Sequence, residues 1–365
     1  MATIRLHLPA ATGDRSYDIV VGRGLLPAVG EAVRAAGGRR ALVVADAAVA
    51  GTHAAAVESS LRAAGIAIAT LTVPAGEASK SIAETARLWE ACAALAVDRE
   101  THVVAVGGGV VGDLAGFVAA TFARGLAWWQ VPTTVVAQVD SAIGGKTGIN
   151  LAAGKNLAGA FWQPRGVFAD IETLGTLPER EFVSGFAEVV KYGMILDAAF
   201  FAWLESQVAP LLAREPEALA QAVERSAALK ADVVARDERE ATGLRAVLNY
   251  GHTFAHAYET TVGYGTLLHG EAVAIGMARA ARLARDLGRI PAEAVRRQDR
   301  LLADLGLPTQ TPPKAAVAAD ELLAAMGRDK KAVGGRLRFV LPSRIGHVEL
   351  VDDVTPDLVR RALAG

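Results

Sequence analysis

Three histidines lie close together in the second half of the chain, at His252, His256 and His269. His252 and His256 are four residues apart, so they share one face of a helix. Thr253 follows His252, so the pair is not the HExxH zinc motif, and a further ligand must come from elsewhere. The best candidate is Glu188, an acid among small and apolar residues in the stretch GFAEVVK. Two imidazoles, one carboxylate and one open position form a catalytic site for Zn²⁺ or a similar divalent ion, whereas any single histidine could instead be a packed polar residue.

A glycine-rich turn stands in the first half, where Thr101–Val106 (THVVAV) runs into Gly107–Asp113 (GGGVVGD). Its glycines match GxGxxG between a strand and a helix, which is the context of a dinucleotide site. Glycines let the backbone approach a pyrophosphate, and the first amides of the next helix bind its charge. The turn is far from the first strand, and Arg124 stands near the place of the acid that usually binds the ribose. Asp46 and Glu77, both upstream, are the acids available for that role. The alternative is a tight turn with only a structural purpose.

Lysines stand beside glycines in Asp140–Asn150 (DSAIGGKTGIN) and Gly154–Asn156 (GKN). A Walker A loop would need glycine at position 140, which is aspartate, so that type of phosphate loop is excluded. Backbone amides and ammonium groups at such positions still suit an anionic ligand. The alternative for each basic residue is a solvated surface charge. Further basic candidates are Arg124, Lys230, Arg245, Lys330 and Lys331.

Composition limits the possible partners. The chain has 365 residues and a formal net charge of −1, so it carries no overall electrostatic signature of a nucleic-acid or anionic-membrane partner. No apolar run reaches the roughly 18 residues of a membrane helix, and Met1–Ala10 does not resemble a signal peptide. The one cysteine, Cys92, excludes an internal disulfide and a cysteine-rich zinc site, and we expect it to be a packing residue. These features favour a cytoplasmic protein.

The elements that must position these residues differ between the two halves. The first half alternates strand and helix signals, which predicts βαβ units around a largely parallel sheet. The expected strands are Tyr17–Val21, Arg40–Asp46, Ile66–Val73 and Thr101–Val106, and the expected helices are Ala55–Ala64, Ser81–Ala96 and Val110–Ala123.

After about residue 175 the pattern becomes helical, and strand signals nearly vanish until Leu337–Leu341. We therefore expect two domains, residues 1–175 and 176–365, with the boundary at Leu174–Pro178. The expected helices of the second domain are Glu179–Leu196, Ala199–Leu212, Glu217–Arg236, His252–Thr261, Glu271–Leu287 and Ala292–Leu305.

Together these segments resemble the 3-dehydroquinate synthase family over roughly residues 40–345. Nine ordered motifs are far more specific than any one of them. The motifs are Gly107–Asp113, Pro132–Thr134, Val139–Asn150, Gly154–Gln163, Thr176–Glu181, Glu188–Lys191, Asn249–His256, His269–Glu271 and Asp329–Lys331.

The resemblance implies a Rossmann-like, NAD-binding α/β domain followed by a mainly α-helical, metal-binding domain, with the active site in the cleft between them. It implies one divalent metal, Zn²⁺ or Co²⁺, held by Glu188, His252 and His269. The NAD contacts that it implies are Asp46, Glu77, Lys80, Gly108, Gly109, Val110, Val111, Gly112, Asp113, Thr133, Thr134, Asp140, Lys155, Thr176, Leu177 and Glu181.

The implied substrate is a phosphorylated keto acid. Its implied contacts are Arg124, Asp140, Lys146, Asn156, Lys191, Lys230, Arg245, Asn249, His256 and one lysine of Lys330 and Lys331. Among these, the catalytic candidates are His256, Lys191, Asn249, Lys146 and Arg245. His256 and Lys191 are the candidates for acid–base steps and proton relay. The resemblance also implies a homodimer in which Arg124 reaches the neighbouring active site.

The sequence departs from the family pattern at two places. Ala142 stands where the family usually has a second serine after Ser141. The stretch Glu238–Arg245 (EREATGLR) is one residue longer than expected, which leaves open whether Glu238 or Glu240 lies near His256.

The implied reaction converts 3-deoxy-D-arabino-heptulosonate 7-phosphate to 3-dehydroquinate and phosphate. It proceeds by transient oxidation with NAD, β-elimination of phosphate, reduction, ring opening and an internal aldol step. The substrate phosphate could itself act as the base. The alternatives are a metal-dependent polyol or alcohol dehydrogenase of related architecture, a cyclase for another sugar phosphate, and a non-catalytic nucleotide-binding protein. The first would not need Lys146, Asn156, Lys230 and Arg245 around a doubly anionic substrate.

Overall fold

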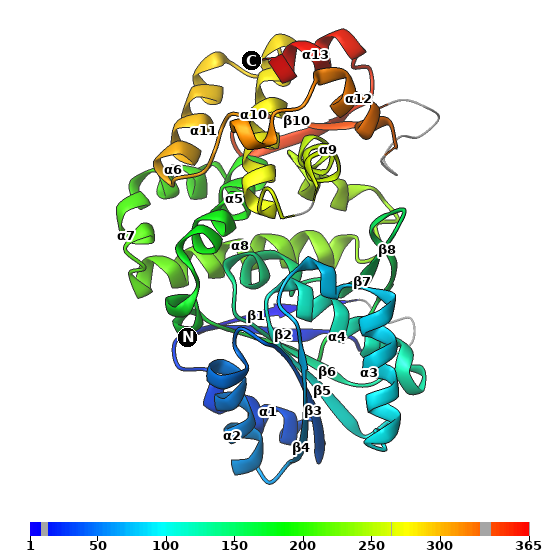
Figure 1. Ribbon diagram of the computed structural model, residues 1–365. Coiled ribbons are helices and arrows are strands. Elements are labelled where there is room, and N and C mark those ends of the chain that lie inside the picture. Colours follow the sequence, from blue (N-terminus) through cyan, green and yellow to red (C-terminus); the bar gives the residue numbers. More distant parts are fainter. Residues whose placement is uncertain (9–13, 264, 329–336, 365) are drawn as a thin grey trace. The chain divides into compact units, whose positions relative to one another are not determined.

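The computed structural model describes residues 1–8, 14–263, 265–328 and 337–364. Its contacts divide the chain into two compact units, whose elements are labelled in Figure 1. Unit 1 comprises Met1–Leu177 and Leu219–Arg239, and unit 2 comprises Pro178–Ala218 and Glu240–Gly365. The first break is two residues beyond the expected boundary at residue 175, but Leu219–Arg239 groups with unit 1 although we expected it in the second domain.

Two polar contacts explain that grouping. The Lys230 ammonium lies 2.6 Å from Asp140 Oδ1, and Glu238 accepts a hydrogen bond of 2.8 Å from Arg15. Both partners belong to the α/β part of the chain. Helical composition therefore did not reveal the unit with which this helix packs.

Unit 1 is built on a seven-stranded sheet in the order β1-β2-β9-β6-β5-β3-β4. The β1–β2 pair is antiparallel, and the other neighbouring pairs are parallel. The strands are β1 (Ala2–Leu6), β2 (Tyr17–Gly22), β3 (Arg40–Asp46), β4 (Ala67–Val73), β5 (Thr101–Gly107), β6 (Trp128–Pro132) and β9 (Gly166–Asp170). The α-helices of this unit are α1 (Val29–Ala35), α2 (Ala55–Ala63), α3 (Ile82–Ala94), α4 (Gly109–Thr121) and most of α8 (Pro216–Arg236).

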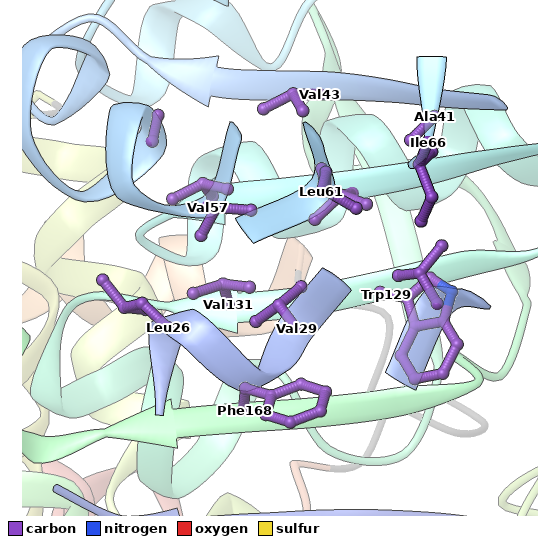
Figure 2. Close-up of a cluster of buried hydrophobic side chains, with 14 of the residues drawn as sticks. Leu26, Val29, Ala41, Val43, Val57, Leu61, Ile66, Trp129, Val131 and Phe168 are labelled. Atoms are coloured by element: carbon purple, nitrogen blue, oxygen red, sulfur yellow. The ribbon is translucent and has the colours of Figure 1, made fainter. Parts of the chain in front are cut away.

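Helices cover both faces of the sheet because successive strand residues point to opposite sides. Val43 packs with α1 and α2, and Figure 2 shows it in one cluster with Val57 and Leu61. Its neighbours Leu42 and Val44 pack in a second cluster with α3 and α4. That cluster contains Cys92, which is fully buried, as expected of a packing residue. The predicted α/β class is confirmed.

The strand order determines where a ligand can bind. β3 lies between β4 and β5, so the chain first adds a strand on one side of β3 and then crosses to the other side. In open α/β sheets, ligands bind outside the carboxyl ends of the strands at such a reversal. Asp46 ends β3 and Gly107 ends β5, so both lie at this point.

The lysine- and glycine-rich segment forms a hairpin. β7 (Lys146–Leu151) pairs antiparallel with β8 (Gly154–Phe161) in a sheet of its own. The strands β6 and β9, each a run of five buried residues, were not among the predicted strands.

Unit 2 is mainly helical. Its α-helices are α5 (Glu179–Leu196), α6 (Ala198–Ser206), α7 (Val208–Leu212), α9 (His252–Val262), α10 (His269–Asp286), α11 (Ala292–Asp304), α12 (Ala319–Arg328) and α13 (Pro356–Ala364). A hairpin of β10 (Phe339–Arg344) and β11 (His347–Val351) completes the unit. Within the described ranges, no helix combines the length and the apolar character that crossing a membrane would require.

The single helix expected at Ala199–Leu212 was wrong. The structure has α6 and α7, separated at Gln207, whose φ of −112° and ψ of 12° are not helical. Pro210 has no N–H to donate to the carbonyl of Ser206, so one continuous helix would lose a hydrogen bond there.

A buried histidine in the sheet of unit 1 makes the stability of the protein depend on pH. Trp129 Nε1–H donates a hydrogen bond of 3.0 Å to His102 Nδ1, so that nitrogen must be unprotonated. Burial, together with the positive charge of Arg165, lowers the pKa of His102 below its ordinary value of 6.5. His102 therefore binds a proton more readily in the unfolded chain than in the folded one. Its contribution to stability is fully present above pH 6.5 and is lost as the pH falls below that value.

Protonation of His102 at low pH should remove its hydrogen bond with Trp129. We therefore expect acidification to lower the free energy of unfolding by on the order of 1 kcal/mol, the value of one buried hydrogen bond. Urea titrations at about pH 7.5 and about pH 5.5 measure this change. His102→Gln keeps an acceptor that does not titrate, so the variant should lose less stability on acidification. Equal losses in the variant and the unmodified protein would contradict this role of His102.

Candidate active site

Glu188, His252 and His269 come together in unit 2. One ligand atom from each lies within 4.8 Å of the others. Glu188 Oε1 is 3.5 Å from Nε2 of His252 and 3.5 Å from Nε2 of His269. Glu188 is fully buried in α5, and the two histidines are the first residues of α9 and α10. The structure therefore gathers the three residues that sequence analysis named as metal ligands.

Close packing of helices makes this arrangement possible. A Cβ on Gly270 would lie 1.8 Å from the carbonyl oxygen of Ser184, so only glycine allows the start of α10 to approach α5. A Cβ on Gly276 would lie 2.2 Å from the carbonyl oxygen of Gly251, which precedes His252. One glycine contact thus brings the start of α10 against α5, which carries Glu188, and the other brings the start of α9 against α10 two turns after His269.

The side chains around the cluster set its charge. Burial alone would lower the pKa of His269, but Glu188 and Glu259 outweigh this effect and raise the pKa to about 10. Lys191, one turn after Glu188 and also buried, forms an ion pair with that carboxylate. The ring of His256 lies edge-on to that of His252, with centroids 5.6 Å apart. The predicted proton-relay candidates His256 and Lys191 therefore both contact the cluster.

Two further predicted substrate residues lie on the short helix η7 (Leu244–Asn249) just before α9. Arg245 is buried, with Nε 3.9 Å from Glu240 Oε1, and Asn249 ends the helix. Glu238, the other acid left open by the sequence, belongs to unit 1 and bonds Arg15. Glu240 is thus the acid that shares a unit with His256.

In unit 1, predicted cofactor residues surround the glycine turn. The turn joins β5 to α4, as expected, and α4 begins at Gly109. A Cβ on Gly107 would lie 2.9 Å from the Cβ of Asp46, and a Cβ on Gly108 would lie 3.1 Å from Thr134. Thr133 N–H donates to the carbonyl of Gly107. The glycines thus let Asp46 and Thr134 approach the backbone at the start of α4 closely, and the start of a helix is where backbone amides can bind a phosphate.

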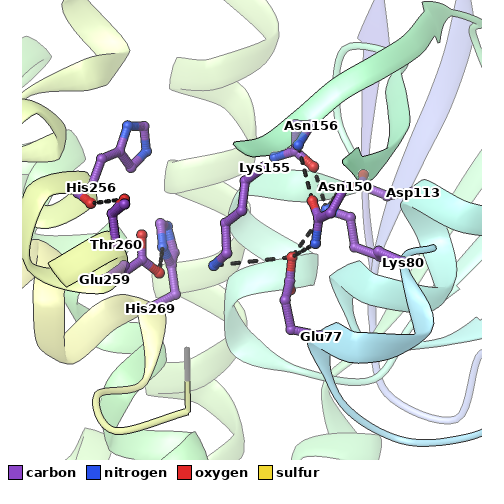
Figure 3. Close-up of polar contacts among 10 residues, drawn as sticks. All are labelled: Glu77, Lys80, Asp113, Asn150, Lys155, Asn156, His256, Glu259, Thr260 and His269. Atoms are coloured by element: carbon purple, nitrogen blue, oxygen red, sulfur yellow. Dashed lines mark hydrogen bonds and ion pairs between the residues drawn. The ribbon is translucent and has the colours of Figure 1, made fainter. Parts of the chain in front are cut away.

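A second group of predicted residues is organised around Lys80, which is only 5% exposed. Its ammonium lies 2.7 Å from Asp113 Oδ2 and 2.5 Å from Asn156 Oδ1, and 3.7 Å from Glu77 Oε1 (Figure 3). Burial opposes the charge of Lys80, but Asp113 and Glu77 outweigh it and raise the pKa of the ammonium. Lys155 lies 4.0 Å from Glu77. The network ties the start of α4 to the β7–β8 hairpin.

The remaining predicted residues of unit 1 are more dispersed. Asp140 pairs with the buried Lys230. Thr176 Oγ1 lies 2.8 Å from Nε2 of His53, whose pKa is lowered by burial.

Lys146 is an exposed residue that begins β7. Leu177 is the last residue of this segment of unit 1, and Glu181 is an exposed residue of α5 in unit 2. Lys330 and Lys331 lie outside the described residues.

Arg124 lies beyond the end of α4, which stops two residues before the end of the helix expected at Val110–Ala123. The helix ends at Thr121, and Ala123 and Arg124 have φ values of 48° and 67°, in the left-handed region that non-glycine residues rarely adopt. A Cβ on Gly125 would lie 2.5 Å from Trp162, so the chain turns sharply against that indole. Arg124 itself is exposed. Such strained residues are concentrated at functional sites.

The structure highlights two residues to which sequence analysis gave no role. Asn150 donates to Glu77 Oε1 at 2.8 Å and accepts from the backbone N–H of Asn156 at 2.9 Å. It ends the quoted stretch DSAIGGKTGIN, which was the available signal. Glu259 lies 3.4 Å from Nδ1 of His269 and is buried. An acid on α9, two turns after His252, was the signal for that residue.

The departure at Ala142 is tolerated because its side chain is fully buried and needs no polar partner.

Known proteins match the whole chain. The family model of the 3-dehydroquinate synthase N-terminal domain matches residues 70–184, and that of the C-terminal domain matches residues 185–332. A 3-dehydroquinate synthase of Rhodopirellula baltica is 48% identical over 363 residues, covering 98% of this chain and 96% of the relative.

Solved structures of sugar phosphate cyclases have the same fold. A 2-epi-5-epi-valiolone synthase from Streptomyces hygroscopicus subsp. jinggangensis, with NAD⁺ and Zn²⁺ bound, has a TM-score of 0.88 at 29% identity and 98% coverage of both chains. A 2-deoxy-scyllo-inosose synthase complexed with carbaglucose-6-phosphate, NAD⁺ and Co²⁺ has a TM-score of 0.90 at 27% identity and 99% coverage of both chains. Since the two family models together match more than half of the sequence, and a relative matches nearly all of it at 48% identity, this chain belongs to the 3-dehydroquinate synthase family.

Proposed function

We propose that this enzyme converts 3-deoxy-D-arabino-heptulosonate 7-phosphate to 3-dehydroquinate and phosphate. The observation that carries the proposal is 48% identity to a 3-dehydroquinate synthase over nearly the full length of both chains. Cyclases for other sugar phosphates share only 27–29% of their residues with this chain. The polyol dehydrogenase alternative is not favoured, because both family models are those of 3-dehydroquinate synthase.

The donor set in unit 2 fits one divalent metal. Two imidazole nitrogens and one carboxylate oxygen are the ligands of a catalytic zinc site, and here they lie within 4.8 Å of one another. Glu188, His252 and His269 would hold the ion. Zn²⁺ and Co²⁺ are the candidates, because one related cyclase structure contains Zn²⁺ and another contains Co²⁺. The bound metal would supply Lewis acidity to a substrate hydroxyl. Lys191 and His256, which contact this cluster, are placed to hold or move a proton during the reaction.

The residues at the glycine turn fit NAD. Gly108 and Gly109 stand at the start of α4, where helix amides can bind a pyrophosphate, and Asp46 stands beside Gly107 at the end of β3, where it can accept hydrogen bonds from a ribose. Bound NAD would supply a temporary hydride acceptor. Glu77, Lys80, Asp113 and Lys155 extend this site toward the hairpin. The remaining NAD contacts would be Val110, Val111, Thr133, Thr134, Asp140, Thr176, Leu177 and Glu181.

A substrate with a carboxylate and a phosphate needs local positive charge, because the chain has a net charge of only −1. Arg245 and Lys230 are our candidates for the carboxylate, since a guanidinium can bond both of its oxygens. Lys146, Asn156 and one of Lys330 and Lys331 are our candidates for the phosphate. Asn249 would bind the substrate between its carboxylate and its phosphate.

We further propose a cytoplasmic homodimer in which Arg124 serves the active site of the neighbouring subunit. Two observations support this arrangement. Arg124 is exposed, and its strained backbone is held by the turn against Trp162. Backbone strain of this kind is concentrated at functional sites.

NAD is expected to be needed only in catalytic amounts, because the overall reaction neither oxidises nor reduces the substrate. Incubating the protein with the heptulosonate phosphate and a small fraction of an equivalent of NAD⁺ should give complete conversion to 3-dehydroquinate, identified by mass spectrometry, together with one phosphate per turnover. A reaction without NAD⁺ and one with a polyol substrate serve as controls. NADH that accumulates one for one with product would instead indicate a polyol dehydrogenase.

A further inference from the structure

His269 has a carboxylate near each of its ring nitrogens. Nε2 lies 3.5 Å from Glu188 Oε1, and Nδ1 lies 3.4 Å from Glu259 Oε1, as Figure 3 shows for the second pair. His252 directs its Nδ1 to the backbone carbonyl of Tyr250 at 3.2 Å. Both histidines therefore turn Nε2 toward the cluster and Nδ1 toward an acceptor, but the acceptor of His269 is charged and that of His252 is neutral.

The two histidines also differ in how firmly packing holds them. The side chain of His252 is 11% exposed, whereas that of His269 is 37% exposed. A more exposed ring has fewer neighbours to fix its rotamer. A hydrogen bond to Nδ1 therefore contributes more to the orientation of His269 than to that of His252.

Glu259 is well placed to provide that orientation. It is 5% exposed, and a buried carboxylate is costly unless it is paired with a donor or a positive charge. It lies on α9, two turns after His252, so the helix that carries one histidine of the cluster also supports the other.

We propose that Glu259 is a positioning residue for the metal centre. This inference rests on the proposed metal site. Glu259 accepts a hydrogen bond from Nδ1–H of His269, so the ring keeps that proton and offers the Nε2 lone pair once a cation displaces the Nε2 proton. Its negative charge also makes the imidazole a stronger donor to a cation.

The test measures metal affinity and not turnover. Zinc affinity is determined by competition with a chelator, and the visible absorption spectrum of the Co²⁺-substituted protein reports ligand geometry. Glu259→Leu should weaken zinc binding by about 10- to 100-fold, the usual effect of losing such a partner, and should change the Co²⁺ spectrum. Glu259→Gln keeps an acceptor oxygen without the charge, so it should lose less affinity and retain a spectrum closer to that of the unmodified protein.

Glu271→Gln is the matched control. Glu271 is two residues from His269, but its carboxylate binds Leu268 N–H and Arg180. This variant should lower the melting temperature of the metal-free protein and leave zinc affinity close to that of the unmodified protein. If folded Glu259→Leu and Glu259→Gln bind zinc like the unmodified protein, or lose no more affinity than Glu271→Gln, the role of Glu259 is refuted. If the unmodified protein itself binds neither Zn²⁺ nor Co²⁺, the proposed metal site is wrong.

Discussion

His269→Ala is expected to lose its metal and nearly all of its activity while remaining folded. The substitution removes one of the three donor atoms that lie within 4.8 Å of one another, and alanine offers no replacement. The Lewis acidity of a bound metal is worth several kcal/mol to a reaction, so turnover should fall by about a thousandfold or more. The fold should survive because His269 is the first residue of α10 and its side chain is partly exposed.

Elemental analysis, circular dichroism and product assays on the same preparation check this expectation. His347→Ala is the control, because His347 is a histidine of the same unit on β11 with a side chain that is 46% exposed. That variant should retain metal and activity. Full metal occupancy in folded His269→Ala would show that this residue is not a ligand.

Mixing Arg124→Ala with Lys146→Ala should restore activity that neither variant has alone. If Arg124 serves the neighbouring site, each mixed dimer contains one site with its own Lys146 and an intact Arg124 from the partner. The other site of that dimer lacks both. Random exchange places half of the subunits in mixed dimers, so about a quarter of the activity of the unmodified protein should return.

Activity is measured before and after subunit exchange, and differently tagged subunits allow the mixed dimers to be purified and counted. Each variant carried through exchange alone is the control, and both should remain inactive. Purified mixed dimers without recovered activity would place Arg124 in its own subunit or outside the active site. A protein that remains monomeric at assay concentration would contradict the proposed dimer directly.

The sequence alone predicted much of the local structure. The predicted strand Arg40–Asp46 and the predicted helix Glu179–Leu196 have the same bounds in the structure. Arg40–Asp46 is a short run of buried apolar residues, and Glu179–Leu196 is long enough to be a helix, so both can be recognised without knowing what they pack against. The metal residues could also be named, because a buried acid and clustered histidines are chemically unusual and their motifs resemble one family.

Tertiary structure decided the rest, because the relevant contacts join residues far apart in the chain. The β7–β8 hairpin carries Lys155 and Asn156, and Asn150 ties it to Glu77. Its sequence is dominated by glycine and polar residues and has no clear period. The assignment of Leu219–Arg239 to unit 1 likewise depends on pairs such as Lys230 with Asp140.

The glycines show most clearly where local reasoning ends. In the sequence, Gly270 merely follows a histidine. In the structure it is the point where α10 meets the backbone of α5 at Ser184, and no side chain would fit there. The sequence therefore determined which residues could bind the metal, Glu188, His252 and His269, since the ability to bind a metal is a property of their side chains. Their convergence within 4.8 Å was decided by helix packing, because a distance between helices depends on all the residues that separate their backbones.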